Sequence, residues 1–386
     1  MIKIAFLIPS LHYGGAERQL VTLVKALDKK CFDVTLFSCY PGGALEKDLE
    51  NSGVKIISLE KRGRWDLFGF FWRLIHHLKS IKPAVLHGYL STPNLLTIFL
   101  KPFFPSTRMI WGVREANVEL TYHDWLSRLI FPWECFLSRF ADLIIGNSNA
   151  GRAYYLSQGF PADKMVVIPN GIDTERFKPD LEARLKVRSE WGILEETILI
   201  GLVGRLEPIK DHPTFLKAAA ILCKHRQDVC FVCVGSGSEN YTQELYQLAE
   251  QLDISEKLIW TGSRADLPAV YNALDIASSS SSSEGFANVI GEAMACCVPC
   301  VVTDVGDSAW IVDNTGKIVP PGNPEALVLG WHSLIGLAPS ERLALKARAR
   351  VRIIEHFSAQ NLVQTTEFYL KKQQIDSQNK VNSINE

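Results

Sequence analysis

Short runs of β-branched and apolar residues alternate with longer amphipathic segments along almost the whole chain. The first such run is Ile2–Ile8, and the segment 16–27 follows it with apolar residues at helical spacing. Strands that alternate with helices form βαβ units, which build parallel sheets with helices on both faces. A second series of the same kind starts at Ile198–Val203. The sequence therefore predicts an α/β protein with two doubly wound, Rossmann-like domains that face one another.

A charged segment between the two series of strands, 177–197, marks the domain boundary. At 386 residues the chain is long enough for two domains of ordinary size. We expect an N-terminal domain over 1–180 and a C-terminal domain over 181–358. The amphipathic residues 359–372 predict a final helix, whereas the polar residues 373–386 predict a disordered tail.

The N-terminus does not have the features of a secretory signal. Its apolar run is followed by Gly14 and Gly15 rather than by a small-residue cleavage site. No apolar run in the chain reaches the roughly 18 residues of a transmembrane helix. The nine cysteines are scattered and odd in number, as in a reducing compartment, and the net charge of −1 gives no indication of nucleic-acid binding. We expect a cytoplasmic protein without nucleic-acid partners.

Two Cys-x-x-Cys pairs, Cys230/Cys233 and Cys297/Cys300, allow two interpretations. Their four thiolates could form a tetrahedral zinc site. However, Cys230 and Cys233 lie in a strand pattern, where residues three apart point to opposite faces of the sheet. We therefore favour buried apolar thiols and expect no metal site.

The predicted strand Ile198–Val203 is followed by a loop with two basic residues, Arg205 and Lys210. Ligands of open α/β sheets bind at the carboxyl ends of the strands, and an arginine fork with a lysine suits a diphosphate. The alternative is two solvated basic side chains, but the helix predicted to follow favours a binding site. The turn with Gly14 and Gly15 also joins a strand to a helix, so it is either a second phosphate-binding turn or a tight turn without a ligand.

The run from Ser278 to Ser283 resembles a flexible linker, but buried-type sequence resumes directly after it. A better interpretation is a strand end, a loop with Glu284 and a helix with Glu292. Backbone N–H groups around 286–289 would point towards an anion in front of this helix. The two carboxylates suit sugar and ribose hydroxyls, although one solvated and one helix-capping glutamate would give the same pattern.

Three motifs together resemble the retaining glycosyltransferases of family 4. They are Gly204-Arg-Leu206 with Lys210 downstream, Glu284-Gly-Phe286 with Glu292 eight residues on, and Pro169-Asn-Gly-Ile-Asp173. Each motif is weak by itself, but their order and spacing are highly specific. The resemblance covers residues 1 to about 371. It implies the GT-B fold, in which two Rossmann-like domains face each other across a cleft.

The resemblance implies a role for each matching residue. Glu284 would hold the hydroxyls of the donor sugar, Glu292 the ribose, and the two basic residues of the first loop the diphosphate. The hinge is implied at Asn170 and Gly171, and the final helix is implied to cross back onto the first domain. Further donor contacts are implied for Gly14, Gly15, Gly235, Gly262, Ser263, Arg264, Gly285, Phe286, Ala287, Asn288 and Val289.

The chain departs from the family pattern in three places. Arg114 stands where many members have a histidine near the reacting carbon, so we expect it to bind a phosphate or an acceptor hydroxyl instead. Cys297 stands where a glycine is frequent, which predicts different packing. The segment 307–312 has no obvious counterpart of an acid that the family carries there.

The resemblance implies a retaining glycosyltransferase, which we expect to be metal-independent and to use Glu284, Arg205, Lys210 and Arg114 as catalytic residues. It would move a sugar from a nucleoside-diphosphate donor to a hydroxyl of a glycan or lipid-linked acceptor, in cell-envelope polysaccharide or lipid-linked glycan synthesis. The sequence has no Asp-x-Asp motif for a divalent metal, and we expect no cofactor. The alternatives are another GT-B enzyme, an epimerase or a phosphorylase, or a non-catalytic subunit that binds nucleotide sugar.

The N-terminal half carries cations interleaved with aromatic residues. Residues 1–180 hold 22 Lys/Arg against 17 Asp/Glu, and the mixed segments are 61–64, 70–73 and 129–133. One interpretation is a surface that docks on anionic lipid at the inner face of the plasma membrane, near a lipid-linked acceptor. The other is that 67–81 is an ordinary amphipathic helix packed on the sheet, which its helical spacing favours.

Overall fold

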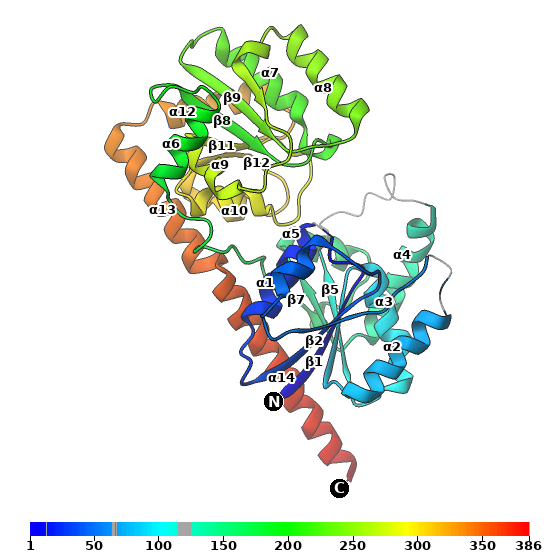
Figure 1. Ribbon diagram of the computed structural model, residues 1–386. Helices are drawn as coiled ribbons and strands as arrows, with labels where there is room; N and C mark the ends of the chain where they lie inside the picture. Colours follow the sequence, from blue (N-terminus) through cyan, green and yellow to red (C-terminus); the bar gives the residue numbers. More distant parts are fainter. Residues whose placement is uncertain (13, 64–65, 67, 115–124, 386) are drawn as a thin grey trace. The chain divides into compact units, whose positions relative to one another are not determined.

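The chain forms two compact units (Figure 1): unit 1 is Met1–Gly171 with Ala359–Glu386, and unit 2 is Ile172–Ser358. The computed structural model describes residues 1–385 except 13, 64–65, 67 and 115–124, and it describes no side chains for 125–129 and 373–385. Each unit contains a parallel sheet whose two faces are buried in separate core clusters. The predicted α/β class with two Rossmann-like domains is confirmed. No helix of the described residues is long and apolar enough to cross a membrane.

Unit 1 is built on a seven-stranded sheet with the order β3-β2-β1-β4-β5-β6-β7. Its strands are β1 (Ile2–Ile8), β2 (Phe32–Ser38), β3 (Lys55–Ser58), β4 (Val85–Tyr89), β5 (Arg108–Val113), β6 (Leu143–Gly146) and β7 (Met165–Val167). Its helices are α1 (Gly15–Ala26), α2 (Phe68–Ile81), α3 (Ser91–Leu100), α4 (Trp125–Leu137), α5 (Asn149–Ser157) and α14 (Ala359–Asn385). Along β1, Phe6 and Ile8 join one core cluster while Ala5 and Leu7 join another. Burial on both faces is why this strand is a continuous apolar run.

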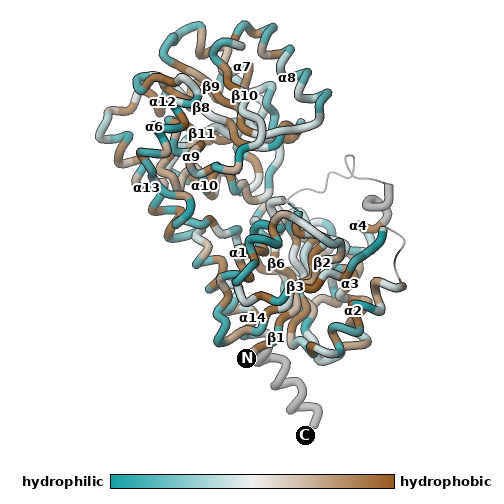
Figure 2. Tube along the Cα trace, viewed as in Figure 1, coloured by the Kyte–Doolittle hydropathy of each residue, from teal (hydrophilic) through white to brown (hydrophobic). Residues whose placement is uncertain are grey.

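Unit 2 is built on a six-stranded sheet with the order β10-β9-β8-β11-β12-β13. Its strands are β8 (Ile198–Val203), β9 (Val229–Val234), β10 (Leu258–Trp260), β11 (Ile276–Ser279), β12 (Cys300–Thr303) and β13 (Lys317–Val319). Its helices are α6 (Leu181–Glu190), α7 (His212–Cys223), α8 (Glu239–Gln251), α9 (Leu267–Ala273), α10 (Asn288–Ala295), α11 (Ser308–Val312), α12 (Pro324–Ile335) and α13 (Pro339–Phe357). In Figure 2, hydrophobic residues follow the strands of each unit and hydrophilic residues cover the outer turns.

Three cysteines of the two pairs, Cys230, Cys233 and Cys300, are buried, and Cys297 is half-buried. Cys230 and Cys233 of β9 belong to different core clusters, on opposite faces of the sheet. Burial raises the pKa of the Cys233 and Cys300 thiols. Among the described residues, no group of three or more His, Cys, Asp or Glu side chains is placed to hold a metal ion.

Unit 1 ends at Gly171, earlier than the predicted boundary at residue 180. The segment 172–180 belongs to unit 2 because its contacts lie there. Phe177 is buried in a core cluster of unit 2, and Arg350 of α13 donates to the carbonyl oxygens of Phe177 and Thr174 at 3.0 and 3.2 Å. The charged segment taken as a boundary in fact contains α6, a helix of unit 2.

The C-terminal segment is helical where a disordered tail was expected. The helix α14 returns to unit 1, where Leu362, Val363 and Leu370 join a core cluster, and its backbone continues to Asn385. The residues after 372 include neither proline nor glycine, so no residue that breaks helices interrupts the one that starts at Ala359.

Cys297 adopts a left-handed conformation directly after α10, with φ of 60°. Glycine is the preferred residue at this position of a helix end, because a Cβ destabilises the left-handed conformation. We therefore predict that Cys297→Gly raises the free energy of unfolding by about 0.5–1 kcal/mol. Urea unfolding of the variant measures this change. Cys297→Ala is the control, since it removes the thiol but keeps the Cβ; an equal gain in both variants would show that the conformation is not the cause.

Candidate active site

The loops at the carboxyl edge of the unit 2 sheet are joined to one another by backbone hydrogen bonds. Five of these loops follow the adjacent strands β10, β9, β8, β11 and β12. The bonds run from Gly235 N to Gly262 O, from Leu206 N to Ser236 O, from Ser282 N to Ile209 O and from Asp307 N to Gly285 O, each 2.9–3.0 Å long. Because each of these five loops is bonded to its neighbour, their backbones are fixed relative to one another.

Lys210 and Glu284 form an ion pair at this edge. The Lys210 ammonium donates to Glu284 Oε1 at 2.5 Å, and the two side chains are 20% and 12% exposed. Lys210 ends a 3-10 turn after β8, and the left-handed Asp211 that follows caps α7 by accepting from Thr214 N at 3.2 Å. The structure thus brings together two of the residues predicted to act in catalysis.

Two serines of the run before Glu284 hold this ion pair in place. Ser281 Oγ donates to Glu284 Oε1 at 2.7 Å. Ser280 Oγ lies 2.9 Å from the carbonyl oxygens of Lys210 and Asp211 and can donate to either. The run is therefore part of the site and not a spacer. The sequence offers no means of distinguishing these two serines from the other four, since only the contacts differ.

Arg205, the other predicted diphosphate ligand, extends into solvent. Its side chain is 74% exposed, and its Nη1 donates to Glu207 Oε1 at 2.7 Å. An exposed ion pair of this kind contributes little stability and exchanges its partner easily. Arg205 is thus available to an anion, although the structure does not join it to the Lys210–Glu284 pair.

The Gly235-Ser-Gly237 turn after β9 packs directly against the basic loop. A Cβ at Gly235, where φ is +151°, would lie 1.9 Å from Gly204 O, and a Cβ at Gly237 would lie 2.0 Å from Leu206 O. These distances are far below any real contact, so both positions need glycine. The turn was predicted to contact the donor, and this stays a prediction. The contacts that the structure shows are with the backbone of the loop that carries Arg205 and Lys210.

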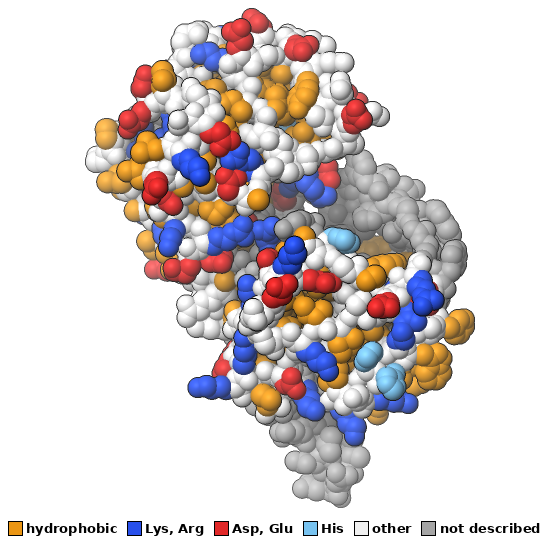
Figure 3. Space-filling view, viewed as in Figure 1, with side chains coloured by type: hydrophobic (Ala, Val, Ile, Leu, Met, Phe, Trp, Pro, Cys, Tyr) orange, Lys and Arg blue, Asp and Glu red, His pale blue; other side chains and the backbone are white. Residues whose placement is uncertain are grey.

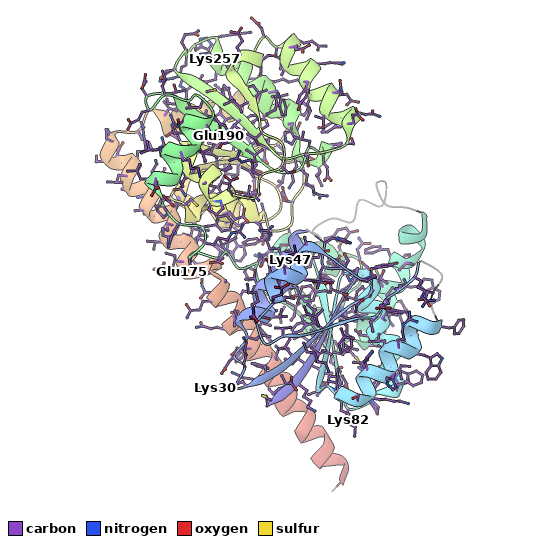
Figure 4. The ribbon with its side chains drawn as sticks, in the orientation of Figure 1. Lys30, Lys47, Lys82, Glu175, Glu190 and Lys257 are labelled. Carbon is purple, nitrogen blue, oxygen red and sulfur yellow. The ribbon has the colours of Figure 1, made fainter. Side chains whose placement is uncertain are left out.

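The loop after β10 contains three residues that were predicted to contact the donor, and one of them, Arg264, is engaged by carboxylates of the chain itself. Gly262 and Ser263 are exposed, and Ser263 Oγ lies 2.7 Å from Ser236 Oγ. Arg264, in contrast, donates to Glu190 at 2.5 Å and to Asp266 at 2.7 Å. Glu190, labelled in Figure 4, ends α6. Hydrogen bonds to both carboxylates raise the pKa of Arg264 above its usual range. The guanidinium is therefore occupied by two carboxylates, and its role as a donor contact stays a prediction.

The segment that leads into α10 is anchored in the core. Phe286 and Ala287 are buried in a core cluster, whereas Asn288 and Val289 are half-buried. Gly285 O accepts the bond from the β12 loop described above. The helix α10 begins at the carboxyl edge, where its dipole adds positive potential. Its N-cap residue Ala287 makes no side-chain hydrogen bond to the first turn.

Glu292 lies inside α10 and is only 8% exposed. Tyr271 OH of α9 donates to Glu292 Oε2 at 2.9 Å. Burial, followed by the nearby Glu292 carboxylate, raises the pKa of Tyr271 well above its ordinary value. The bond joins α9 to α10. The predicted role of Glu292 as a ribose ligand stays a prediction.

In unit 1, Arg114 contacts the predicted hinge. Its guanidinium lies 4.5 Å from the centre of the Tyr89 ring and donates to Tyr89 OH at 2.5 Å and to Asn170 Oδ1 at 3.3 Å. The next residue, Gly171, exchanges two hydrogen bonds, of 3.0 and 2.8 Å, with the buried side-chain amide of Gln19 on α1. The sequence analysis missed Gln19, although a glutamine between apolar residues on the inner face of a helix is a signal for such a contact.

Gly14 and Gly15 start α1 as a turn without a side-chain cap. Gly14 is extended, with φ of −158°, so its backbone does not need glycine. Tyr13, which precedes this turn, lies outside the described residues. The same holds for two other parts of the sequence predictions, Arg64 and the segment 115–117. A phosphate contact at this turn stays a prediction.

Both halves of the chain match models of known families. Residues 184–352 match the family described as glycosyl transferases group 1, and residues 13–176 match the family described as glycosyltransferase family 4. Among solved structures, Anabaena HepE in complex with UDP-glucose matches with a TM-score of 0.83 and 22% identity, over 96% of this chain and 100% of that one. At this identity the likeness shows the fold, which is that of the GT-B enzymes.

Two curated relatives match over most of their length. One is the GalNAc-alpha-(1->4)-GalNAc-alpha-(1->3)-diNAcBac-PP-undecaprenol alpha-1,4-N-acetyl-D-galactosaminyltransferase of Campylobacter jejuni, 29% identical over 89% of each chain. The other is the UDP-Gal:alpha-D-GlcNAc-diphosphoundecaprenol alpha-1,3-galactosyltransferase of Escherichia coli, 27% identical over 81% of this chain and 82% of that protein. The chain spans about half the length of the D-inositol 3-phosphate glycosyltransferases that it also matches.

The close approach at Gly235 gives a testable prediction. Gly235→Ala should displace the loop that carries Arg205 and Lys210 and lower the free energy of unfolding by about 2 kcal/mol or more. Urea unfolding measures the loss, and amide exchange at Leu206 reports whether the bond to Ser236 has opened. Gly322→Ala is the matched control, because Gly322 also has a positive φ but no atom within 4 Å of its Cβ position. Equal losses in the two variants would contradict the packing role of Gly235.

Proposed function

Because the chain belongs to the group 1, family 4 glycosyltransferases, we propose that it transfers a sugar from a nucleoside-diphosphate donor to a hydroxyl of a lipid-linked glycan, with retention of configuration and without a metal. The Campylobacter jejuni and Escherichia coli relatives are named for acceptors linked to undecaprenol, which supports a lipid-linked acceptor in cell-envelope glycan synthesis. The second is also named for UDP-Gal, which supports a uridine diphosphate sugar as the donor.

The Lys210–Glu284 ion pair carries this proposal. It joins a cation and a carboxylate at 2.5 Å at the carboxyl edge of the sheet, where ligands of open α/β sheets bind. When a donor binds, its diphosphate replaces Glu284 as the partner of the Lys210 ammonium. Glu284, still held by Ser281, then accepts hydrogen bonds from hydroxyls of the donor sugar.

In the proposed reaction, the acceptor oxygen bonds to the anomeric carbon on the face that the diphosphate leaves. The bond between the anomeric carbon and the diphosphate oxygen breaks, and the acceptor proton goes to an oxygen of the departing diphosphate. Lys210, the exposed Arg205 and the N-terminal dipole of α10 stabilise the negative charge that develops on that group. These groups supply the charge that a metal supplies in enzymes with an Asp-x-Asp motif.

Variants of the ion pair separate sugar contacts from diphosphate contacts. We predict that Glu284→Gln lowers turnover by about 100-fold or more, because the carboxylate aligns the donor sugar. The same variant should bind UDP as well as or better than the wild type, since Lys210 has lost its internal partner. Lys210→Met should weaken UDP binding by about tenfold or more and lower turnover as well. Titration calorimetry measures UDP binding, and release of nucleoside diphosphate from a donor chosen by thermal shift measures turnover with a membrane extract as acceptor.

Ser283→Ala is the matched control, because this serine lies in the same loop and is bonded to neither member of the pair. It should retain turnover within about twofold. Turnover of Glu284→Gln at the wild-type level would refute the assignment. The assays are run in EDTA, and a loss of activity that Mg²⁺ or Mn²⁺ restores would refute the metal-independent reaction. An α-configured product measured by NMR would support retention, and a β-configured product from an α-linked donor would exclude it.

Seven exposed aromatic residues gather on three adjacent segments of unit 1. Nine phenylalanines and tryptophans are exposed among the described residues, and seven of them belong to this set. We call it the aromatic surface: Phe68 and Trp72 of α2, Phe99 and Phe103 of α3 and the turn after it, and Trp133, Phe136 and Phe140 of α4 and the turn after it. Figure 3 shows hydrophobic side chains beside Lys and Arg side chains at the outer edge of unit 1, where Figure 1 places α2.

The helix α2 has a buried face and an exposed face, and both carry aromatic residues. Its inner face buries Phe70, Leu74, Ile75 and Leu78 against the sheet, as predicted for an ordinary amphipathic helix. Core packing does not account for its outer face, where Phe68 is 85% exposed. Aromatic side chains at the surface of a soluble unit suit the boundary between lipid headgroups and acyl chains.

Cations also lie along the aromatic surface. Lys101 Nζ donates to Phe140 O at 2.7 Å and to Asp142 Oδ2 at 3.1 Å, so its charge is partly balanced by that carboxylate. The Arg139 guanidinium lies 4.3 Å from the centre of the Phe136 ring. A group of exposed aromatics and cations fits an anionic bilayer. We propose that unit 1 docks there on the membrane that holds the lipid-linked acceptor.

Vesicle flotation tests this docking. We predict that the wild type floats with vesicles that contain anionic lipid, and that Trp72→Ser/Trp133→Ser reduces the floating fraction by about fivefold or more. Trp310→Ser/Phe368→Ser removes two exposed aromatics outside the aromatic surface and should leave flotation unchanged. Equal flotation of both double variants, or none of the wild type, would refute the docking surface.

A further inference from the structure

A cavity of about 270 Å³ lies in unit 2 at the amino edge of the sheet, opposite the carboxyl edge with the ion pair. Ile198 and Ile276, the first residues of β8 and β11, line it together with Pro299, which comes directly before β12. The end of α12 and the first half of α13 complete the wall. None of the residues of the candidate active site lines this cavity, so it needs its own explanation.

Lys346 of α13 lines the cavity with an ammonium that has no partner among the described side chains. The side chain is half-buried and makes no hydrogen bond or ion pair with any described residue. Burial and the neighbouring Arg184 and Arg342 guanidiniums lower the pKa of Lys346, whereas the Asp275 carboxylate acts in the opposite direction. Asp275 is paired with Arg184 and Arg188 rather than with Lys346, so a bound anion would stabilise this ammonium further.

Arg342 lies one helical turn before Lys346 and lines the same cavity. Its Nη2 donates to Ile335 O at 2.8 Å and to Leu337 O at 3.3 Å, at the end of α12. These bonds hold the side chain while the other N–H groups of its guanidinium have no partner among the described residues of unit 2. A planar guanidinium beside an ammonium is a suitable arrangement for a carboxylate or a phosphate.

The acidic residues of the cavity do not satisfy these cations. Asp275 accepts from Arg184 at 2.8 Å, from Arg188 at 3.1 Å and from Leu199 N at 2.8 Å, so both of its oxygens are occupied. Glu195 and Glu196 are exposed at the rim, where water screens them. The half-buried Lys346 and the exposed Arg342 therefore form no direct ion pair with the acidic residues that line the cavity, although Asp275 attracts Lys346.

The rest of the wall is apolar. Ile198, Ile276, Leu334, Ile335 and Leu345 line the cavity beside the two cations. A site with one charged side and one apolar side selects a ligand of the same two-sided chemistry. Inorganic anions would use only the charged side, and neutral hydrocarbons only the other.

We propose that this cavity binds a small amphipathic anion, with its carboxylate or phosphate on Lys346 and Arg342 and its apolar part against Ile276 and Leu345. The site is separate from the donor site and does not depend on the proposed reaction. It is nonetheless connected to the donor site, since β8 and β11 run from the cavity to the loops that carry Lys210 and Glu284.

Titration calorimetry of the full chain with phenyl phosphate tests the proposal. Phenyl phosphate combines a phosphate with an apolar ring, whereas inorganic phosphate and phenol each supply one half. We expect phenyl phosphate to bind most tightly, to raise Tm with concentration, and to lose about tenfold or more in affinity in Lys346→Met. Methionine keeps the apolar stem of lysine and removes a half-buried charge, so the variant is expected to fold.

Lys210→Met is the control for binding at the donor site. Phenyl phosphate should bind this variant as it binds the wild type, because Lys210 lies at the other edge of the sheet. Loss of binding in Lys210→Met with retention in Lys346→Met would overturn the proposal. So would absence of phenyl phosphate binding in the wild type, or inorganic phosphate or phenol binding as tightly as phenyl phosphate.

Discussion

Burial of both sheet faces is the constraint on which the rest of this structure depends. Each strand of a doubly wound sheet is covered on both sides, so apolar side chains dominate the middle of the strands and polar groups concentrate at the strand ends. The strand β11 shows this clearly. It starts at Ile276, beside the cavity with Lys346, and it ends at Ser279, directly before the serines that hold Glu284. Both sites of unit 2 result from this one constraint.

The polar groups at the carboxyl edge lie outside the hydrophobic core, so core packing does not fix their positions. Backbone hydrogen bonds from loop to loop fix the loops that carry these groups, and such bonds need close approach of main chains. The missing Cβ of Gly235 allows the β9 loop to reach Gly204 O, and the missing Cβ of Gly306 allows the β12 loop to reach Glu284 O. Glycines that resemble a ligand motif in the sequence thus also have a structural reason, because a side chain at either position would separate the loops.

The elements of the fold were largely predictable, because β-branched runs and helical spacing are local signals. The strand β8, for example, has the predicted bounds, Ile198–Val203. The domain boundary was not predicted correctly, because contacts between residues far apart in the sequence determine it. The segment 172–180 joins unit 2 through Arg350, far along the chain, and no local pattern shows this. The charged helix α13 was not predicted either, since its many cations hide the apolar spacing of its buried face.

The same distinction applies to the site residues. Lys210 and Glu284 were each predicted at the carboxyl edge of the sheet because each follows a strand, but their ion pair was not predicted, since it depends on the strand order that places β8 beside β11. The pairing of Arg264 with Glu190 was not predicted, because it joins residues 74 positions apart without a motif. The sequence shows that a charged side chain follows a strand. Which side chain it then contacts depends on the three-dimensional fold.

Arg114 was expected to stand in place of a histidine of the family, and its contacts show what a guanidinium does at this point. Its guanidinium contacts Tyr89 and Asn170, and Gly171 next to Asn170 is held by the amide of Gln19. A Cβ at Gly171 would lie 2.7 Å from Ala359 Cα, so the point where the chain leaves unit 1 and the point where it returns lie close together. An imidazole has neither the reach nor the fork of a guanidinium, and it could not contact both partners at once. In this chain, therefore, Arg114 is a positioning residue for the segment at which the chain leaves unit 1.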